Sequence, residues 1–364
     1  MLSPAVEGSI SIPTAPWGLR PRLYAYACVR RLRDFCAKAA ALSGTTRTLR
    51  LRHRFRLIFL ANPLGPNSTS KVMKRILLQT TIPHIENNWH IDRFSLLRDH
   101  LRSLKDGQGV SQFEVTTRNR EENPSGDDPV LSKLDTSEFS QLWLFAVDTG
   151  DGLSVSDCEG ITRFRQRGGG IMATRDHQDL GLSLCTLGGV GRAHFFHSKQ
   201  QEPDTGRQAP DDQANKDISW PNYHSGANGN YQHLSLVQPV HKIMRNDANP
   251  SGVIEYFPAH PHEGAVGVPD KESAARVVAT SVSQTTERPF NLVVAFERSV
   301  DRHGNNLGRA VAQSSFHHFV DYNWDTSMGC PTFLTEAPGD QIKREPEKLE
   351  DMRAYVRNLA QWLS

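Results

Sequence analysis

The sequence lacks the features that mark several large classes of protein. Its five cysteines are odd in number and widely spaced, and no CxxC pair occurs, which argues against a disulfide framework or a zinc finger. No apolar run approaches the roughly 20 residues that a membrane helix needs. The glycine-rich RQRGGGI holds neither GxGxxG nor GxxxxGK, so it does not predict a phosphate-binding loop. We therefore expect free thiols, a reducing compartment and, from that, a cytoplasmic protein.

Acidic residues are scarce at the N-terminus. Residues 1–72 carry ten Arg and two Lys against Glu7 and Asp34, a net charge of +10, whereas the remaining 292 residues carry −8. The segment ends in the linker-like ANPLGPNSTS. It fits a transit peptide, an upstream extension before a true start at Met73, or a basic tail, and these readings stay open. Because the basic charge belongs to this segment and not to the body, we expect no nucleic-acid partner, and because long apolar runs are lacking, we expect no membrane association.

From Met73 onward, strand and helix patterns alternate. MKRILLQTT, FEVTTRN, LWLFAV and IMAT are short apolar runs typical of buried strands. DRFSLLRDHLRSL has helical spacing, and SVSDCEGITRFRQRGGG begins with a serine cap and ends at glycine. The β-α-β-β-α-β order predicts an α/β fold, a mostly parallel sheet with helices on both faces, in a single domain spanning residues 73–364.

The second half is less regular. Residues 198–232 are polar and rich in Gly, Pro, Asn and Asp, which predicts a long surface insertion. Strand patterns return at residues 276–284, 290–298 and 309–315, and residues 346–364 predict an amphipathic C-terminal helix.

With these elements in place, the body resembles the class I glutamine amidotransferase-like (flavodoxin-like) superfold, in its ThuA-like, trehalose-utilisation branch. The matching stretches are MKRILLQTT, RFRQRGGGIMATRDH, HPHEG and RAVAQSSFHHFVDYN, over roughly residues 73–330. A working glutaminase of this superfold carries a nucleophilic cysteine on the turn after the fourth strand. Here that turn reads ATRDHQD, and no cysteine lies between Cys158 and Cys185. We therefore expect no glutamine hydrolysis.

The turn TRDHQD is the first candidate site, because parallel α/β sheets present their chemistry at the carboxyl ends of strands. Arg175 is a candidate for binding an anionic or carbonyl oxygen of a substrate. Asp176 and His177 are candidates for an acid–base pair, since a carboxylate can orient a histidine. The alternative is a polar turn whose Asp176 caps the next helix.

The loop HPHEG is the second candidate site. His260 and His262 are two residues apart, so on an extended segment they would point the same way. Together with Glu263 they are candidate catalytic residues, and two histidines with a carboxylate suit a divalent metal, which is left open. The alternative is a histidine-rich loop held by backbone hydrogen bonds.

Two further stretches supply candidate substrate-binding residues. FHHFVDYNW contains His317, His318 and Asp321, and only one of the adjacent histidines can face a given pocket. Asp148 follows the third predicted strand at the same sheet edge, where it could bind sugar hydroxyls or simply cap a turn.

Together these features predict a ThuA-like protein that acts on a small polar substrate, such as a carbohydrate, by histidine–carboxylate chemistry. The alternative is a non-catalytic protein that binds a ligand or partner on a degenerate amidotransferase scaffold. A small-molecule ligand is expected, no cofactor is certain, and a homo-oligomer is left open.

Overall fold

A computed structural model describes residues 73–177, 180–194 and 223–364. The basic segment 1–72 and most of the insertion 198–232 lie outside the described residues. The strands are β1 (Lys74–Thr80), β2 (Phe113–Arg118), β3 (Gln141–Phe145), β4 (Gly170–Thr174), β5 (Tyr231–His233), β6 (Ser235–Leu236), β7 (Tyr256–Pro258), β8 (Ala275–Val282), β9 (Pro289–Phe296), β10 (Ser299–Val300), β11 (Asn306–Leu307) and β12 (Ala310–Gln313). The α-helices are α2 (Ser95–Ser103), α3 (Val155–Gln166), α4 (Gln341–Arg344) and α5 (Leu349–Leu363).

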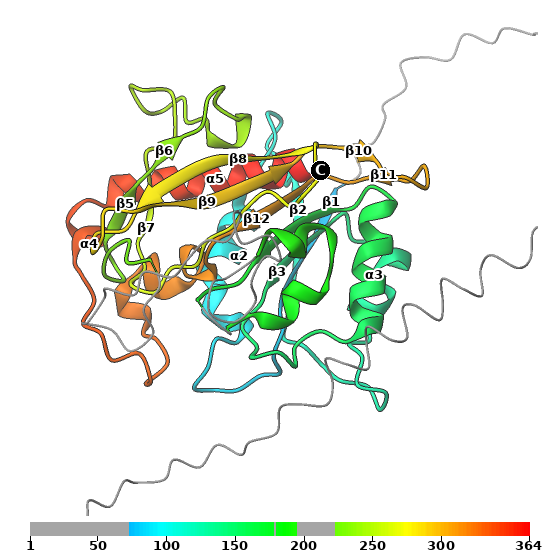
Figure 1. Cartoon of the computed structure of the whole chain (residues 1–364). Coiled ribbons are helices and arrows are strands. Elements are labelled where there is room, and N and C mark those ends of the chain that lie inside the picture. Colours follow the sequence, from blue (N-terminus) through cyan, green and yellow to red (C-terminus); the bar gives the residue numbers. More distant parts are fainter. Residues whose placement is uncertain (1–72, 178–179, 195–222) are drawn as a thin grey trace, which may run out of the picture. The chain divides into compact units, whose positions relative to one another are not determined.

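One eight-stranded sheet organises these elements, in the order β2-β1-β3-β4-β12-β9-β8-β6 (Figure 1). Strands β2, β1, β3, β4 and β12 run parallel to one another, whereas β9 is antiparallel to both β12 and β8, and β8 is antiparallel to β6. The predicted mostly parallel α/β sheet is confirmed. The strands predicted at 276–284 and 290–298 also form, but as an antiparallel extension of the sheet.

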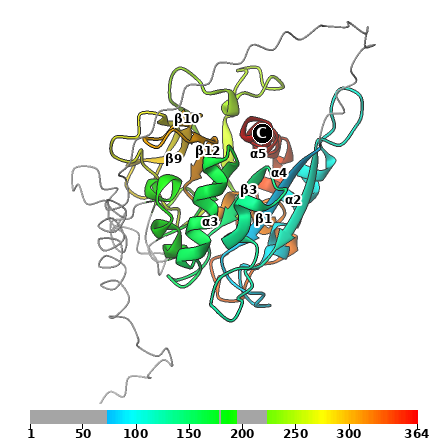
Figure 2. The same cartoon turned by 90° about the vertical axis from the view of Figure 1, so that its right-hand side faces the viewer.

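Helices cover both faces of the sheet, and each face has its own apolar core. Within β1, Ile76 and Leu78 belong to the core that includes α2 and α5, whereas Leu77 belongs to the core that includes α3. This division follows from the alternation of side chains along a strand. Figure 2 shows α3 on one side of the sheet and α2 and α5 on the other. No described helix is both long and apolar enough to span a bilayer.

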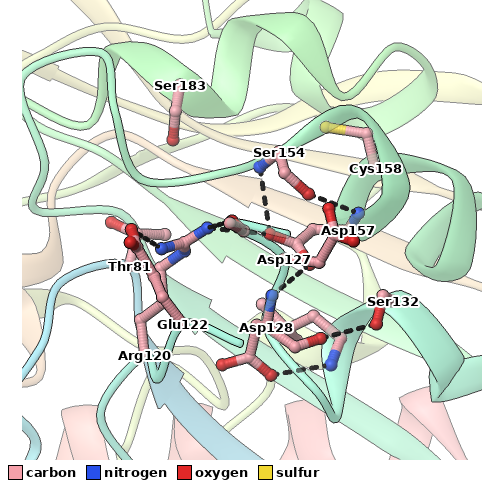
Figure 3. A network of polar contacts seen from close by, with 12 residues as sticks. Thr81, Arg120, Glu122, Asp127, Asp128, Ser132, Ser154, Asp157, Cys158 and Ser183 are labelled. Atoms are coloured by element: carbon pink, nitrogen blue, oxygen red, sulfur yellow. Dashed lines mark hydrogen bonds and ion pairs between the residues drawn. The ribbon is translucent and has the colours of Figure 1, made fainter. Parts of the chain in front are cut away.

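The helix α3 begins and ends where the sequence predicts. Ser154 accepts a hydrogen bond from the Asp157 backbone, and the Asp157 carboxylate accepts one from the Ser154 backbone, which makes a capping box (Figure 3). The buried Arg120 reaches the same carboxylate at 3.3 Å. The helix stops at Gly168, whose φ of 95° is one that glycine adopts without strain. This network joins α3 to the carboxyl edge of the sheet.

Candidate active site

The register of the parallel strands brings the predicted stretches that follow β3, β4 and β12 to one edge of the sheet. Thr80 pairs with Phe145, Phe145 with Thr174, and Thr174 with Gln313, so these four residues lie side by side at the ends of β1, β3, β4 and β12. Residues that follow them emerge at that edge. The turn after β4 and the segment after β12 are therefore neighbours, although about 140 residues separate them in sequence.

Asp176 is the centre of the candidate site. It is fully buried two residues after β4, and its Oδ2 atom lies 3.2 Å from His260 Nε2, 3.6 Å from His317 Nε2 and 3.9 Å from His177 Nε2. The other carboxylate oxygen, Oδ1, is buried with no hydrogen-bond partner among the described residues. A buried, incompletely bonded carboxylate facing three histidines is unfavourable for stability alone, which makes this cluster the candidate functional site.

His260 reaches Asp176 from a different part of the chain. The residues before and within HPHEG pair with the segment that begins at Tyr223: Tyr223 and Glu263 exchange backbone hydrogen bonds, and Ser225 Oγ accepts from the His260 backbone at 2.9 Å. Tyr223, Ser225 and Asn228 are all nearly fully buried. The sequence placed these residues in a polar surface insertion. Instead they support the loop, because the backbone of a buried loop needs hydrogen-bond partners.

The rings of His260 and His317 stack, with centroids 3.5 Å apart and planes 10° apart. Burial holds the pKa of both imidazoles well below the usual value of about 6.5. The neighbouring histidines lower the pKa of His260 further, whereas the Asp176 carboxylate partly offsets the effect for His317. Both side chains are therefore neutral near pH 7. The spacing predicted that only one of the two adjacent histidines could face a given pocket, without indicating which; His317 faces the cluster and His318 does not.

His262 lies beside His260 but has a different partner. Their ring centroids are 5.5 Å apart, yet His262 Nε2 lies 2.8 Å from Glu336 Oε1. Burial alone would raise the pKa of Glu336, but the hydrogen bond with His262, backbone hydrogen bonds and the His262 charge together lower that pKa. The side chains of His177 and Glu336 are 14% and 25% exposed, compared with 2% or less for Asp176, His260 and His317, so they form the accessible side of the cluster.

Glu263 and His318 form a second, closed network behind this cluster. Both are fully buried, with His318 Nε2 at 2.8 Å from Glu263 Oε1. Glu263 also accepts hydrogen bonds from Ser225 Oγ, Gln232 Nε2 and Ser314 Oγ. All acceptor positions face donors, so the geometry gives Glu263 and His318 a supporting role, although the sequence made them candidates for catalysis and substrate binding.

Arg175, predicted to bind a substrate oxygen, is turned into the protein. It is fully buried and donates to Cys185 Sγ at 2.7 Å and to the Leu180 carbonyl oxygen at 3.3 Å. Burial raises the pKa of the Cys185 thiol despite the Arg175 charge, and burial raises the pKa of Cys158 to about 11. Both thiols are protonated at neutral pH, and neither follows β4 directly.

The remaining two carboxylates lie outside the histidine cluster. Asp148 is buried and accepts hydrogen bonds from Thr81 Oγ1 at 2.6 Å and from Ser183 Oγ at 2.7 Å. Asp321 accepts from the backbone of Ser95 and of Leu96, at the start of α2. Asp148 thus stabilises a turn and Asp321 caps a helix, and neither side chain is brought to Asp176.

Two residues of the site were not foreseen from the sequence. Asn228 Oδ1 lies 2.9 Å from His260 Nδ1, and Glu336 is the partner of His262. Neither follows a predicted strand or belongs to a recognisable motif, and local sequence carries no signal for contacts at 32 and 74 residues' separation.

The chain matches no protein-family model and no curated protein. Among solved structures it is similar to the mmIFT52 N-terminal domain (12% identity, TM-score 0.41, covering 77% of this chain and 97% of that one). It is also similar to the Trypanosoma brucei CTPS glutaminase domain with bound acivicin (12% identity, TM-score 0.40, covering 79% of this chain and 93% of that one). A ThuA-like protein from Parabacteroides merdae is similar as well (16% identity, TM-score 0.36, covering 66% of this chain and 78% of that one). These likenesses are too distant to indicate an activity, and the fold class rests on the topology above.

Proposed function

We propose that the protein is an enzyme of the ThuA-like kind that acts on a small polar substrate at the Asp176 cluster. The observation that carries the proposal is the meeting of His177, His260 and His317 around one buried carboxylate oxygen. Imidazoles and carboxylates recognise hydroxyl and carbonyl groups by hydrogen bonds, and histidine transfers protons near neutral pH. A carbohydrate or another polyhydroxy compound fits this lining better than an apolar ligand.

The residues have different roles in this proposal. His260 and His317 are deeply buried and neutral, so an unprotonated ring nitrogen suits accepting a hydrogen bond from a substrate hydroxyl group. His177 lies on the more accessible side, and the buried His262 contacts the more exposed Glu336, which orients its ring. Both histidines therefore suit proton transfer. A carboxylate that orients a histidine and stabilises its charged form is a recurring arrangement in acid–base catalysis.

A panel of sugars, sugar acids and hydroxy acids, screened by thermal shift and then followed by NMR for conversion, tests the proposal. We expect a compound that raises the melting temperature of the wild type and is converted by it. Asp176→Asn should abolish conversion, and His262→Ala should reduce it by roughly 100-fold or more, the usual contribution of a general acid or base.

Asp321→Asn is the matched control, because it makes the same chemical change in a carboxylate that caps α2. It should leave conversion unchanged. Binding that depends on Asp176 without any conversion would favour the non-catalytic, ligand-binding alternative. Binding or conversion that Asp176→Asn leaves intact would contradict the proposed site.

A further inference from the structure

The loop after β1 brings together two histidines and a carboxylate that are not part of the Asp176 cluster. His84 Nδ1 lies 3.9 Å and His90 Nδ1 lies 3.4 Å from the same oxygen, Asp92 Oδ2, and the candidate ligand atoms of all three residues lie within 4.8 Å of one another. Both distances exceed those of ordinary N–H···O hydrogen bonds, and His90 Nδ1 is buried without a hydrogen-bond partner among the described residues. A shared proton therefore does not explain why these atoms converge.

The planes of the two imidazole rings cross. The ring centroids of His84 and His90 are 4.5 Å apart and the planes are 55° apart. Because a histidine lone pair lies in the plane of its ring, an ion on the line where the two planes cross can accept a lone pair from each ring. Parallel rings have no such line.

The distances also suit a metal ion. Metal bonds of 2.0–2.2 Å in a tetrahedron separate neighbouring ligand atoms by about 3.3–3.6 Å. The separations of 3.4 and 3.9 Å are close to this range. The side chains of His84 and Asp92 are 56% and 64% exposed, so both can rotate to close the remaining gap without disturbing the core.

The charges around the loop leave these ligand atoms available. Burial, followed by the neighbouring His84 and Arg93 charges, lowers the pKa of His90, so its ring is unprotonated at neutral pH and keeps a lone pair. The carboxylate of Asp92 supplies the negative charge. The Arg93 guanidinium donates to the Gly329 carbonyl oxygen at 3.3 Å and so does not occupy that carboxylate.

A cavity gives an ion access to the loop. Its volume is about 640 Å³, and its lining includes His84 and Asp92 together with Arg118 and Arg120. Each of the two arginines is already paired with a fully buried carboxylate from another segment. Neither therefore competes with a cation for Asp92.

We propose that His84, His90 and Asp92 bind one divalent first-row transition-metal ion, for which Zn²⁺ is the probe. Two imidazoles and one carboxylate are a common ligand set for these metals, and water completes the coordination on the exposed side. The proposal goes beyond the proposed function, because it uses none of the residues of the Asp176 cluster.

An ion at this position would stabilise one wall of the Asp176 cluster. The loop between His84 and His90 carries the buried Trp89, whose ring meets the His317 ring edge-on with centroids 4.7 Å apart. An ion that joins His84 to His90 would close this loop into a ring. The ion would thereby limit the movement of Trp89 relative to His317.

The test uses the full-length chain, dialysed against a chelator and kept reduced, and measures Zn²⁺ binding by calorimetry. His84→Ala and Asp92→Asn should each weaken Zn²⁺ affinity at least tenfold, since the loss of an outer partner of a metal ligand alone costs about 10- to 100-fold. His303→Ala and Asp247→Asn are the matched controls, because both side chains are exposed and outside the ligand set. Each should change the affinity less than twofold.

Two variants at exposed positions keep the test independent of folding, and circular dichroism establishes that each is folded. A further measurement uses the wild type alone. Diethyl pyrocarbonate modifies unprotonated imidazoles, and peptide mass spectrometry locates the modified residues. Saturating Zn²⁺ should protect His84 from modification and leave His303 reactive.

The outcomes separate this site from the proposed catalytic one. Unchanged modification of His84 at saturating Zn²⁺, or an affinity that folded His84→Ala and Asp92→Asn both leave intact, would overturn the metal site. Protection of His177 and His262 in place of His84 would also overturn it, because the ion would then lie at the Asp176 cluster. Zn²⁺ binding is measured without substrate, so a failure to find substrate conversion leaves this result standing.

Discussion

At the scale of single residues, two buried carboxylates in the same region have opposite surroundings. Glu263 faces donors from Ser225, Gln232, Ser314 and His318. Asp176 Oδ1 has no partner among the described residues, and its Oδ2 faces imidazole nitrogens only. A satisfied buried network stabilises the fold, whereas an unsatisfied one costs stability. The two carboxylates should therefore respond differently to the same loss of charge.

We predict that Glu263→Gln lowers the free energy of unfolding by about 1–3 kcal/mol, because the new amide NH₂ would face donors inside the protein. Asp176→Asn should cost less than about 1 kcal/mol, since it removes a buried charge whose Oδ1 atom has no hydrogen-bond partner among the described residues. Urea denaturation of both variants beside the wild type measures the difference. Equal losses for the two variants would show that Asp176 is as important for stability as Glu263.

The sequence predicted that Asp176 lies at the site, but not that Glu263 has a supporting role. Asp176 and His317 could be found because each follows a strand, and the carboxyl ends of parallel strands share an edge. The supporting role of Glu263 could not be found, because its partners come from two distant stretches of the chain, residues 225–232 and 314–318. The spacing of His260 and His262 predicted a common direction. The structure gives their Nε2 atoms different carboxylates, which only the tertiary placement of Glu336 determines.

At the scale of elements, each glycine of the run Gly168–Gly170 is required for a different reason: one for its positive φ and two for the close approach of neighbouring atoms. Gly168 ends α3 with a positive φ. A Cβ on Gly169 would lie 2.4 Å from the Phe164 ring, and a Cβ on Gly170 would lie 2.4 Å from the carbonyl oxygen of Leu363 in α5. The sequence predicted the helix stop. It could not predict that the C-terminal helix closes on β4, because that contact joins elements almost 200 residues apart.

We predict that Gly170→Ala destabilises the protein by about 1–3 kcal/mol, because the backbone of α5 must move away from the sheet. Gly107→Ala is the control, since a Cβ there has no atom within 4 Å and the residue requires no positive φ. It should stay within about 0.5 kcal/mol of the wild type. Thermal and urea unfolding measure both. A neutral Gly170→Ala would mean that α5 docks more loosely than the structure shows.

At the scale of the whole molecule, the orientation of the strands decides which residues meet. Apolar runs gave the positions of the main strands, but periodicity carries no information on direction, so the antiparallel pairing of β8 and β9 was not predicted. That pairing matters, because Val266, three residues beyond Glu263, donates a backbone hydrogen bond to Asn291 in β9. The loop that carries His260 is thus tied to the antiparallel part of the sheet while His260 itself reaches the parallel part.

Buried histidines make the stability of the whole molecule depend on pH, and His194 gives the clearest case. Burial, reinforced by the nearby Arg175 charge, lowers the pKa of His194 to about 3. In the unfolded chain its pKa is about 6.5, so below that pH the unfolded state binds a proton that the folded state does not. The contribution of His194 to stability is therefore constant above about pH 6.5 and falls as the pH drops toward 3.

We predict that, between pH 7.5 and pH 5, this residue alone lowers the free energy of unfolding by about 2 kcal/mol, which is 1.5 pH units at about 1.4 kcal/mol each. His194→Gln cannot titrate, so the variant should lose about 2 kcal/mol less than the wild type over that interval, whatever its stability at pH 7.5. Urea denaturation at several pH values gives both slopes. Parallel slopes for the two proteins would show that His194 is protonated in the folded state, and the burial that the structure assigns to its ring would then be wrong.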